Sequence, residues 1–99
     1  MRIFTDANKI GKISRTTGEV TEYPIPTANS GPSGITLGPD GGLWFTESLA
    51  DKIGKISVKT GIITEYDVLT GNSQVTGITS GPDDNLWFTE SMGNKIGKV

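Results

Sequence analysis

The fold is decided by the stretch Gly34-Ile35-Thr36-Leu37-Gly38-Pro39-Asp40-Gly41-Gly42-Leu43-Trp44-Phe45-Thr46-Glu47-Ser48, which predicts a β-hairpin. Ile35 and Leu37 alternate with small or polar residues, as in a strand with one buried face. Residues 38–42 are Gly, Pro and Asp, which favour a turn because they fix φ, tolerate positive φ or bond their own backbone. The aromatic and β-branched run at 43–46 then favours a return strand.

Two large apolar residues are adjacent in that return strand. Trp44 and Phe45 point to opposite faces of a sheet, so both faces must be covered. We therefore expect stacked sheets, with Trp44, Phe45 and their later copies Trp87 and Phe88 as structural residues buried between them. A ligand platform made of the two tryptophans is the alternative, but recurrence at the same repeat position favours the core.

The whole chain repeats with a period of 43 residues. The hairpin returns from Gly77 to Ser91, and 31 of 50 positions are identical when residues 7–56 are aligned with 50–99. Each repeat holds four short strands and no helical periodicity, which is typical of a β-propeller blade. We expect an all-β single domain of about two blades over residues 1–99. Its repeats cover residues 1–42, 43–85 and, in part, 86–99.

The four strands of a blade can be named from the inside of the propeller outward. We expect the inner strand at 34–38, the second at 43–47, the third at 52–57 and the outer at 63–68. Residues 2–26 hold a second, third and outer strand, and Ile3 aligns with Trp44 when Arg2-Ile3-Phe4 is matched to Leu43-Trp44-Phe45. Pro24 and Pro26 cannot donate ladder hydrogen bonds, which favours a sheet edge there. Residues 77–99 hold an inner, a second and a third strand.

Composition excludes several classes of function. The net charge is −2 at pH 7 and the chain has no Cys and no His, so neither nucleic acid nor thiol chemistry is indicated. No apolar run approaches the roughly 20 residues of a membrane span, so we expect no membrane partner. The chain begins directly with repeat sequence, so we expect no signal peptide and a cytoplasmic location.

The repeat motifs resemble those of a known family. Gly-Ile-Thr-x-Gly-Pro-Asp-x-x-Leu-Trp-Phe-Thr-Glu, Lys-Ile-Gly-Lys-Ile and Thr-Gly-x-Ile-Thr-Glu-Tyr are similar to the blades of virginiamycin B lyases, also called streptogramin B lyases, over essentially the whole chain. The resemblance implies seven-bladed monomers, roughly three times as long, that open a cyclic depsipeptide antibiotic by elimination. It implies a magnesium ion, glutamates and a histidine, with Glu-Pro-His before Gly-Ile. This chain has Gly31-Pro32-Ser33 and Gln74-Val75-Thr76 there.

We therefore predict no catalytic residue and no protein metal site. A ligand site on the propeller rim would use Ser33, Glu47, Thr76 and Glu90, which lie near the ends of inner and second strands. Such a site would take a small molecule, and magnesium if the protein works as a lyase. Asp40, Asp83 and Asp84 are assigned to turns, since calcium needs more converging oxygens than these turns offer.

Regularly spaced lysines and glutamates complete the pattern. Lys9 and Lys52 lie on third strands, with Glu22 and Glu65 on the neighbouring outer strands. We expect cross-strand ion pairs on a solvated face.

Two blades cannot close a ring, because known propellers have about four to eight. We expect a homo-oligomer, with a trimer giving six blades favoured over a tetramer giving eight. The expected junction is a composite blade with inner and second strands from one chain and third and outer strands from the next. The favoured function is a structural or binding module. The alternative is a magnesium-dependent streptogramin B lyase that breaks a C–O bond by elimination.

Overall fold

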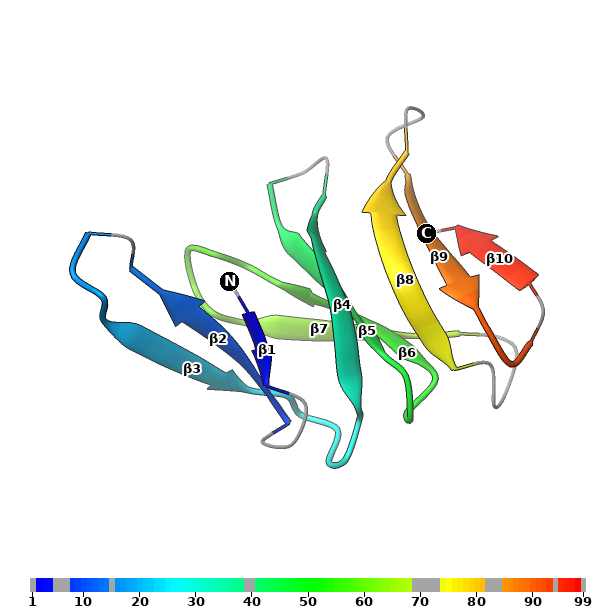
Figure 1. Cartoon of the computed structure of the whole chain (residues 1–99), viewed down its shortest axis with the longest axis horizontal. Coiled ribbons are helices and arrows are strands. Elements are labelled where there is room, and N and C mark those ends of the chain that lie inside the picture. The colour runs from blue at the N-terminus through cyan, green and yellow to red at the C-terminus, as the bar shows by residue number, and fades with distance from the viewer. Residues whose placement is uncertain are drawn as a thin grey trace.

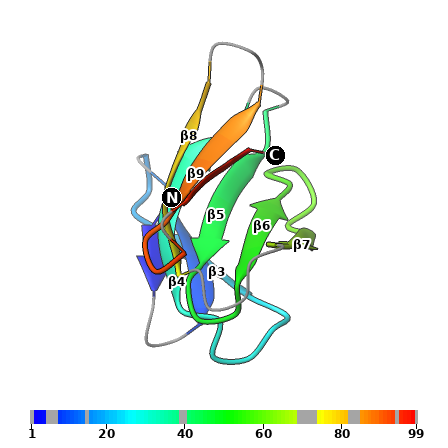
Figure 2. The same cartoon turned by 90° about the vertical axis from the view of Figure 1, so that its right-hand side faces the viewer.

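The structure is a computed structural model, and it describes residues 2–4, 8–14, 16–38, 41–68, 74–81, 85–93 and 95–98. Within these residues ten strands form three antiparallel sheets that stand beside one another like fanned blades (Figure 1). Turned by 90°, the sheets lie one behind another (Figure 2). In the same part of the chain, no helix is long and apolar enough to cross a membrane.

The sheets follow chain order. The first contains β1 (Arg2–Phe4), β2 (Lys9–Ile13) and β3 (Val20–Pro24). The second contains β4 (Pro32–Leu37), β5 (Leu43–Glu47), β6 (Lys52–Ile56) and β7 (Ile63–Asp67). The third contains β8 (Val75–Ser80), β9 (Leu86–Glu90) and β10 (Lys95–Lys98). We call them the N-terminal, central and C-terminal sheets.

The predicted blade is confirmed in the central sheet, where strand order runs from β4 to β7 as expected. The inner strand begins earlier than predicted, at Pro32, and a bulge interrupts its register between Pro32 and Ile35. Inner strands β4 and β8 lie next to each other, and β1 lies beside β4 (Figure 1). The proline-containing strand β3 is an edge strand, as predicted.

The register of β1 differs from the sequence alignment. Ile3 pairs with Ile10, whereas the central sheet pairs Trp44 with Lys55 and Thr46 with Ile53. Ile3 therefore takes the place of Thr46 rather than that of Trp44. Four residues therefore connect β1 to β2, as four connect β5 to β6, and β1 keeps the 43-residue period of the chain.

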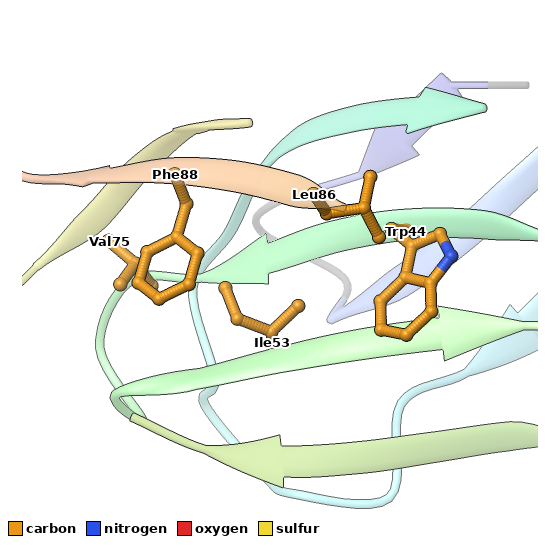
Figure 3. Close-up of a cluster of buried hydrophobic side chains, with 5 residues drawn as sticks. All are labelled: Trp44, Ile53, Val75, Leu86 and Phe88. Carbon is orange, nitrogen blue, oxygen red and sulfur yellow. The ribbon is translucent and has the colours of Figure 1, made fainter. Parts of the chain in front are cut away.

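Both faces of the central sheet are buried, as the Trp44-Phe45 pair predicted. On one face, Phe45 and Ile56 pack with Ile10 and Ile25 of the N-terminal side. On the other, Trp44 and Ile53 pack with residues of the C-terminal sheet (Figure 3). The buried members of that second cluster are Trp44, Ile53, Val75, Leu86 and Phe88.

Trp44 is held by its own sheet as well as by the next. Its ring stacks on Tyr66 with centroids 5.6 Å apart, and the Lys55 ammonium lies 5.3 Å from its centroid. Trp87 lies under Lys98 in the same way but remains 36% exposed. The expectation that both tryptophans are buried is therefore met within this chain by Trp44 alone, because no further sheet covers the C-terminal one.

We predict unequal costs for removing the two tryptophans from the monomer. Trp44→Ala should lower the free energy of unfolding by about 3–5 kcal/mol, the usual range for a large core aromatic. Trp87→Ala should cost less, because its ring has lost less contact with water. Urea unfolding followed by circular dichroism at high dilution measures both. Equal losses would show that Trp87 is packed as tightly as Trp44.

Candidate functional site

The two ends of the β4–β5 hairpin are built differently. At one end, Ser48 N–H donates to the Gly31 carbonyl (3.0 Å) and Leu49 N–H donates to the Ser30 carbonyl (2.9 Å). The segments before the inner strand and after the second strand thus share one rim. At the other end, Gly41 has φ of 84° within the predicted turn. Asp40, Asp83 and Asp84, assigned to turns, lie outside the described residues.

The predicted rim hydroxyls contact other hydroxyls. Ser33 Oγ lies 2.8 Å from Thr46 Oγ1 and 2.7 Å from Ser48 Oγ. Thr76 Oγ1 lies 3.1 Å from Thr89 Oγ1. Both Ser33 and Thr76 are exposed on inner strands. The structure therefore brings Ser33 and Thr76 to the inner strands but joins neither to a carboxylate.

Hydroxyls of the central sheet also bind the following sheet. Thr46 Oγ1 donates to the Thr76 carbonyl (3.0 Å), and Ser48 Oγ donates to the Val75 carbonyl (2.5 Å). These bonds attach the inner strand of one blade to the second strand of the blade before it. The rim residues thus serve first to join blades.

Glu47 does not reach the rim surface. Its side chain is fully buried, on the same face of β5 as Phe45 and over Gly54, where an added Cβ would lie 2.8 Å from Glu47 Oε2. Glu90, at the equivalent position, is also buried, and its Oε1 has no hydrogen-bond partner. Both carboxyl groups therefore lie inside the blade stack, because alternation along the strand turns them toward the preceding blade.

Glu65 completes an acidic pair that the sequence analysis missed. The pKa of Glu47 is raised to about 8, chiefly by burial and also by hydrogen bonding to, and charge repulsion from, the neighbouring Glu65 carboxyl. Thr27 Oγ1 donates to Glu65 Oε1 (3.0 Å), whereas Glu65 Oε2 and both Glu47 oxygens are buried without another partner. The structure therefore places two carboxyl groups side by side at a buried position between blades.

The pair lies under the segment that connects the N-terminal and central sheets. Asn8 Oδ1 accepts from Ser30 N–H (3.0 Å) and from Ser30 Oγ (2.7 Å), and Asn8 Nδ2 donates to the Thr27 carbonyl (2.8 Å). Asn8 and Asp51 both have left-handed φ, at 56° and 55°. Asn8 and Asp51 occupy the same position in successive 43-residue repeats, and Ser30 recurs as Ser73. These recurring polar residues are the sequence signal that could have identified the connecting segment.

Only one of the predicted ion pairs forms as expected. Lys9 Nζ lies 3.7 Å from Glu22 Oε1. Lys52 instead hydrogen-bonds Asp67 (2.6 Å), which raises the Lys52 pKa, and Glu65 turns inward to Glu47. Glu22 and Glu65 occupy equivalent repeat positions but have different partners, because the Glu65 side chain points toward Glu47 and the Glu22 side chain toward Lys9.

Among the described residues, no group of three or more His, Cys, Asp or Glu side chains is placed to hold a metal ion. Both Glu47 carboxyl oxygens and Glu65 Oε2 are buried, and Glu65 Oε1 accepts a hydrogen bond from Thr27.

The raised pKa of Glu47 predicts a pH dependence of stability. Between about pH 4.5 and 8 the folded protein retains a proton that the unfolded chain releases, so the free energy of unfolding falls as pH rises through this window. Glu47→Gln should flatten the curve, because the amide does not titrate. Thermal melts from pH 5 to 8 measure this, with exposed Glu19→Gln as the control. Parallel curves for wild type and Glu47→Gln would contradict the assignment.

Comparison with known proteins identifies the source of this blade pattern. A sequence model of the virginiamycin B lyase family matches residues 3–99. Virginiamycin B lyase from Saccharopolyspora erythraea is 57% identical over 30 residues, which are 30% of this chain and 10% of that protein.

Solved structures match nearly the whole chain. Virginiamycin B lyase from Staphylococcus aureus superposes with a TM-score of 0.92 at 47% identity, over 96% of this chain and 32% of that one. A streptogramin B lyase structure gives 0.90 at 48% identity, over 96% and 31%. A catalytically inactive histidine-to-alanine variant of the Staphylococcus aureus enzyme with quinupristin gives 0.83 at 38% identity, over 96% and 35%. The chain thus spans about a third of these proteins, and it belongs to the virginiamycin B lyase family.

Proposed function

We propose that this chain is a structural and binding module: a blade unit of a lyase-type propeller that performs no chemistry by itself. One observation carries the proposal. The glutamates that end the second strands, Glu47 and Glu90, are buried between blades, and the chain contains no histidine. The rim is left with Ser33 and Thr76, whose hydroxyls bind neighbouring hydroxyls.

The chemistry of elimination supports this proposal. Opening the depsipeptide by elimination requires a base that removes the proton next to a carbonyl. The related Staphylococcus aureus enzyme is described as catalytically inactive when a histidine is replaced by alanine. In the sequence pattern Ser33 and Thr76 stand where the family resemblance implies the histidine, and neither hydroxyl is a base near neutral pH.

A magnesium-dependent streptogramin B lyase is the second candidate. Family membership and the names of its relatives favour it. Magnesium prefers carboxylate and water oxygens. Glu47 and Glu90 do not fit such an ion on the rim, because both carboxyls turn into the blade stack. For this candidate, the base and the metal ligands would have to come from other blades.

We propose that further copies of the chain complete the propeller ring, as a trimer of six blades or, second, a tetramer of eight. The open faces of the two outer sheets support this. Ile96 is 72% exposed on the C-terminal sheet, and Ile13 and Val20 are about half exposed on the N-terminal sheet. Exposed apolar faces of this kind mark interaction surfaces. We propose a small molecule as the rim ligand, and neither nucleic acid nor membrane as a partner.

Two measurements test the proposal. Light scattering should give a mass of about three chains of 10.5 kDa, and a mass of one chain at high concentration would contradict the assembly. Incubation of the protein with a streptogramin B antibiotic and magnesium should leave the cyclic depsipeptide of the antibiotic intact. Ring opening at a rate proportional to protein concentration would establish the lyase instead.

A further inference from the structure

We propose that copies of the chain join by strand exchange, with β9 of one copy pairing with β2 of the next in place of β1. The inference rests on the proposed self-assembly and names the surfaces that meet. The resulting composite blade contains β8 and β9 from one copy and β2 and β3 from its neighbour. Strands β1 and β10 are released at the junction.

The sequence of β2 makes it an equivalent partner for β9. Residues 9–12, 52–55 and 95–98 are all Lys-Ile-Gly-Lys. Within the chain, β9 pairs with β10 so that Glu90 faces Lys95, Phe88 faces Gly97 and Trp87 faces Lys98. The central sheet repeats this register between β5 and β6. Pairing β9 with β2 therefore reproduces every cross-strand contact, with Lys9, Gly11 and Lys12 as the partners.

Gly11 favours β9 over β1. In the two other sheets a phenylalanine ring covers the equivalent glycine: a Cβ at Gly54 would collide with the Phe45 ring, and one at Gly97 would collide with the Phe88 ring. The register of β1 instead places Arg2 opposite Gly11. Strand β2 thus carries the glycine that receives a phenylalanine, whereas β1 does not supply the ring.

The C-terminal sheet has a hollow of about 510 Å³, lined by Thr89, Glu90 and Ser91 at the end of β9 and by Lys95 and Ile96 of β10. In the composite blade Lys9 and Ile10 of β2 take the places of these two β10 residues. In the central sheet, at the positions 43 residues earlier, Thr46 and Ser48 bind carbonyls of β8 and Ile53 packs on Val75. In the composite blade, β4 of the neighbouring copy occupies the hollow, with Pro32 at the position equivalent to Val75.

The exchange also covers the tryptophan that the single chain leaves exposed. Strands β2 and β3 already pack on their own central sheet through Ile10, which is fully buried, whereas Ile96 of β10 is 72% exposed. Replacing β10 with β2 places Trp87 beside Tyr23 and Lys12, as Trp44 lies beside Tyr66 and Lys55. The exchange breaks the backbone hydrogen bonds that β1 makes to β2 and that β10 makes to β9. In return it forms a four-stranded composite blade that is buried on both faces.

A pair of cysteine variants tests the exchange, because the chain has no cysteine of its own. Thr89 faces Ile96 within the chain and would face Ile10 of a neighbour, and directly opposite strand residues lie within disulfide range. Oxidised Thr89→Cys/Ile10→Cys should form covalently linked oligomers on a non-reducing gel. In the oxidised Thr89→Cys/Ile96→Cys variant, a disulfide should hold β9 to β10 within one chain. Light scattering should then give the mass of a single chain. Reduction of this second variant should restore assembly, so each protein is its own control for folding.

The outcomes separate the exchange from self-assembly. If the locked variant assembles to the wild-type mass, the exchange is wrong while self-assembly stands. If wild type itself remains a single chain, both proposals fail. Removal of residues 1–4 provides a second variant, since it frees β2 without touching β9. The shortened chain should assemble at least as well as wild type, and loss of its assembly would show that β1 is needed at the junction.

Discussion

The structure depends on one constraint: two bulky apolar residues stand next to each other in a strand whose side chains alternate between faces. Trp44 and Phe45 cannot both be buried by one layer, so the central sheet must lie between two others. The N-terminal sheet covers Phe45 and the C-terminal sheet covers Trp44. The same pair recurs as Trp87 and Phe88, so each added blade needs a further blade, and stacking propagates around an axis.

The phenylalanine of each pair also determines the composition of the third strand. Its ring lies over Gly54 or Gly97, and a side chain at either glycine would collide with it. The lysine one residue later lies over the tryptophan on the opposite face. Lys-Ile-Gly-Lys is therefore the complement of Trp-Phe-Thr-Glu. Because all copies of the complement are alike, the same pairing can be made within a chain or between chains.

Blade contacts also explain the chemistry of the rim. The hydroxyls of Thr46 and Ser48 bind the next inner strand, and the carboxyl of Glu47 is covered by the segment through Thr27 and Ser30. The hydroxyl groups at this blade junction thus bind the neighbouring blade, whereas both Glu47 oxygens are buried without a hydrogen-bond partner. The solved structures of virginiamycin B and streptogramin B lyases share this architecture over the matched third of their length.

The sequence alone determined the strands, their order and the stacked architecture, because periodicity, turn residues and the 43-residue repeat depend only on local chemistry and spacing. The sequence pattern placed Glu47 at the propeller rim. Only the tertiary structure decided that the Glu47 carboxyl is buried. Glu65 and the segment containing Thr27 cover this carboxyl through packing, and both lie far from Glu47 in the sequence. The register of β1 follows the 43-residue repeat, and the match of Arg2-Ile3-Phe4 to Leu43-Trp44-Phe45 was misleading because a three-residue strand carries too little pattern to specify its own alignment.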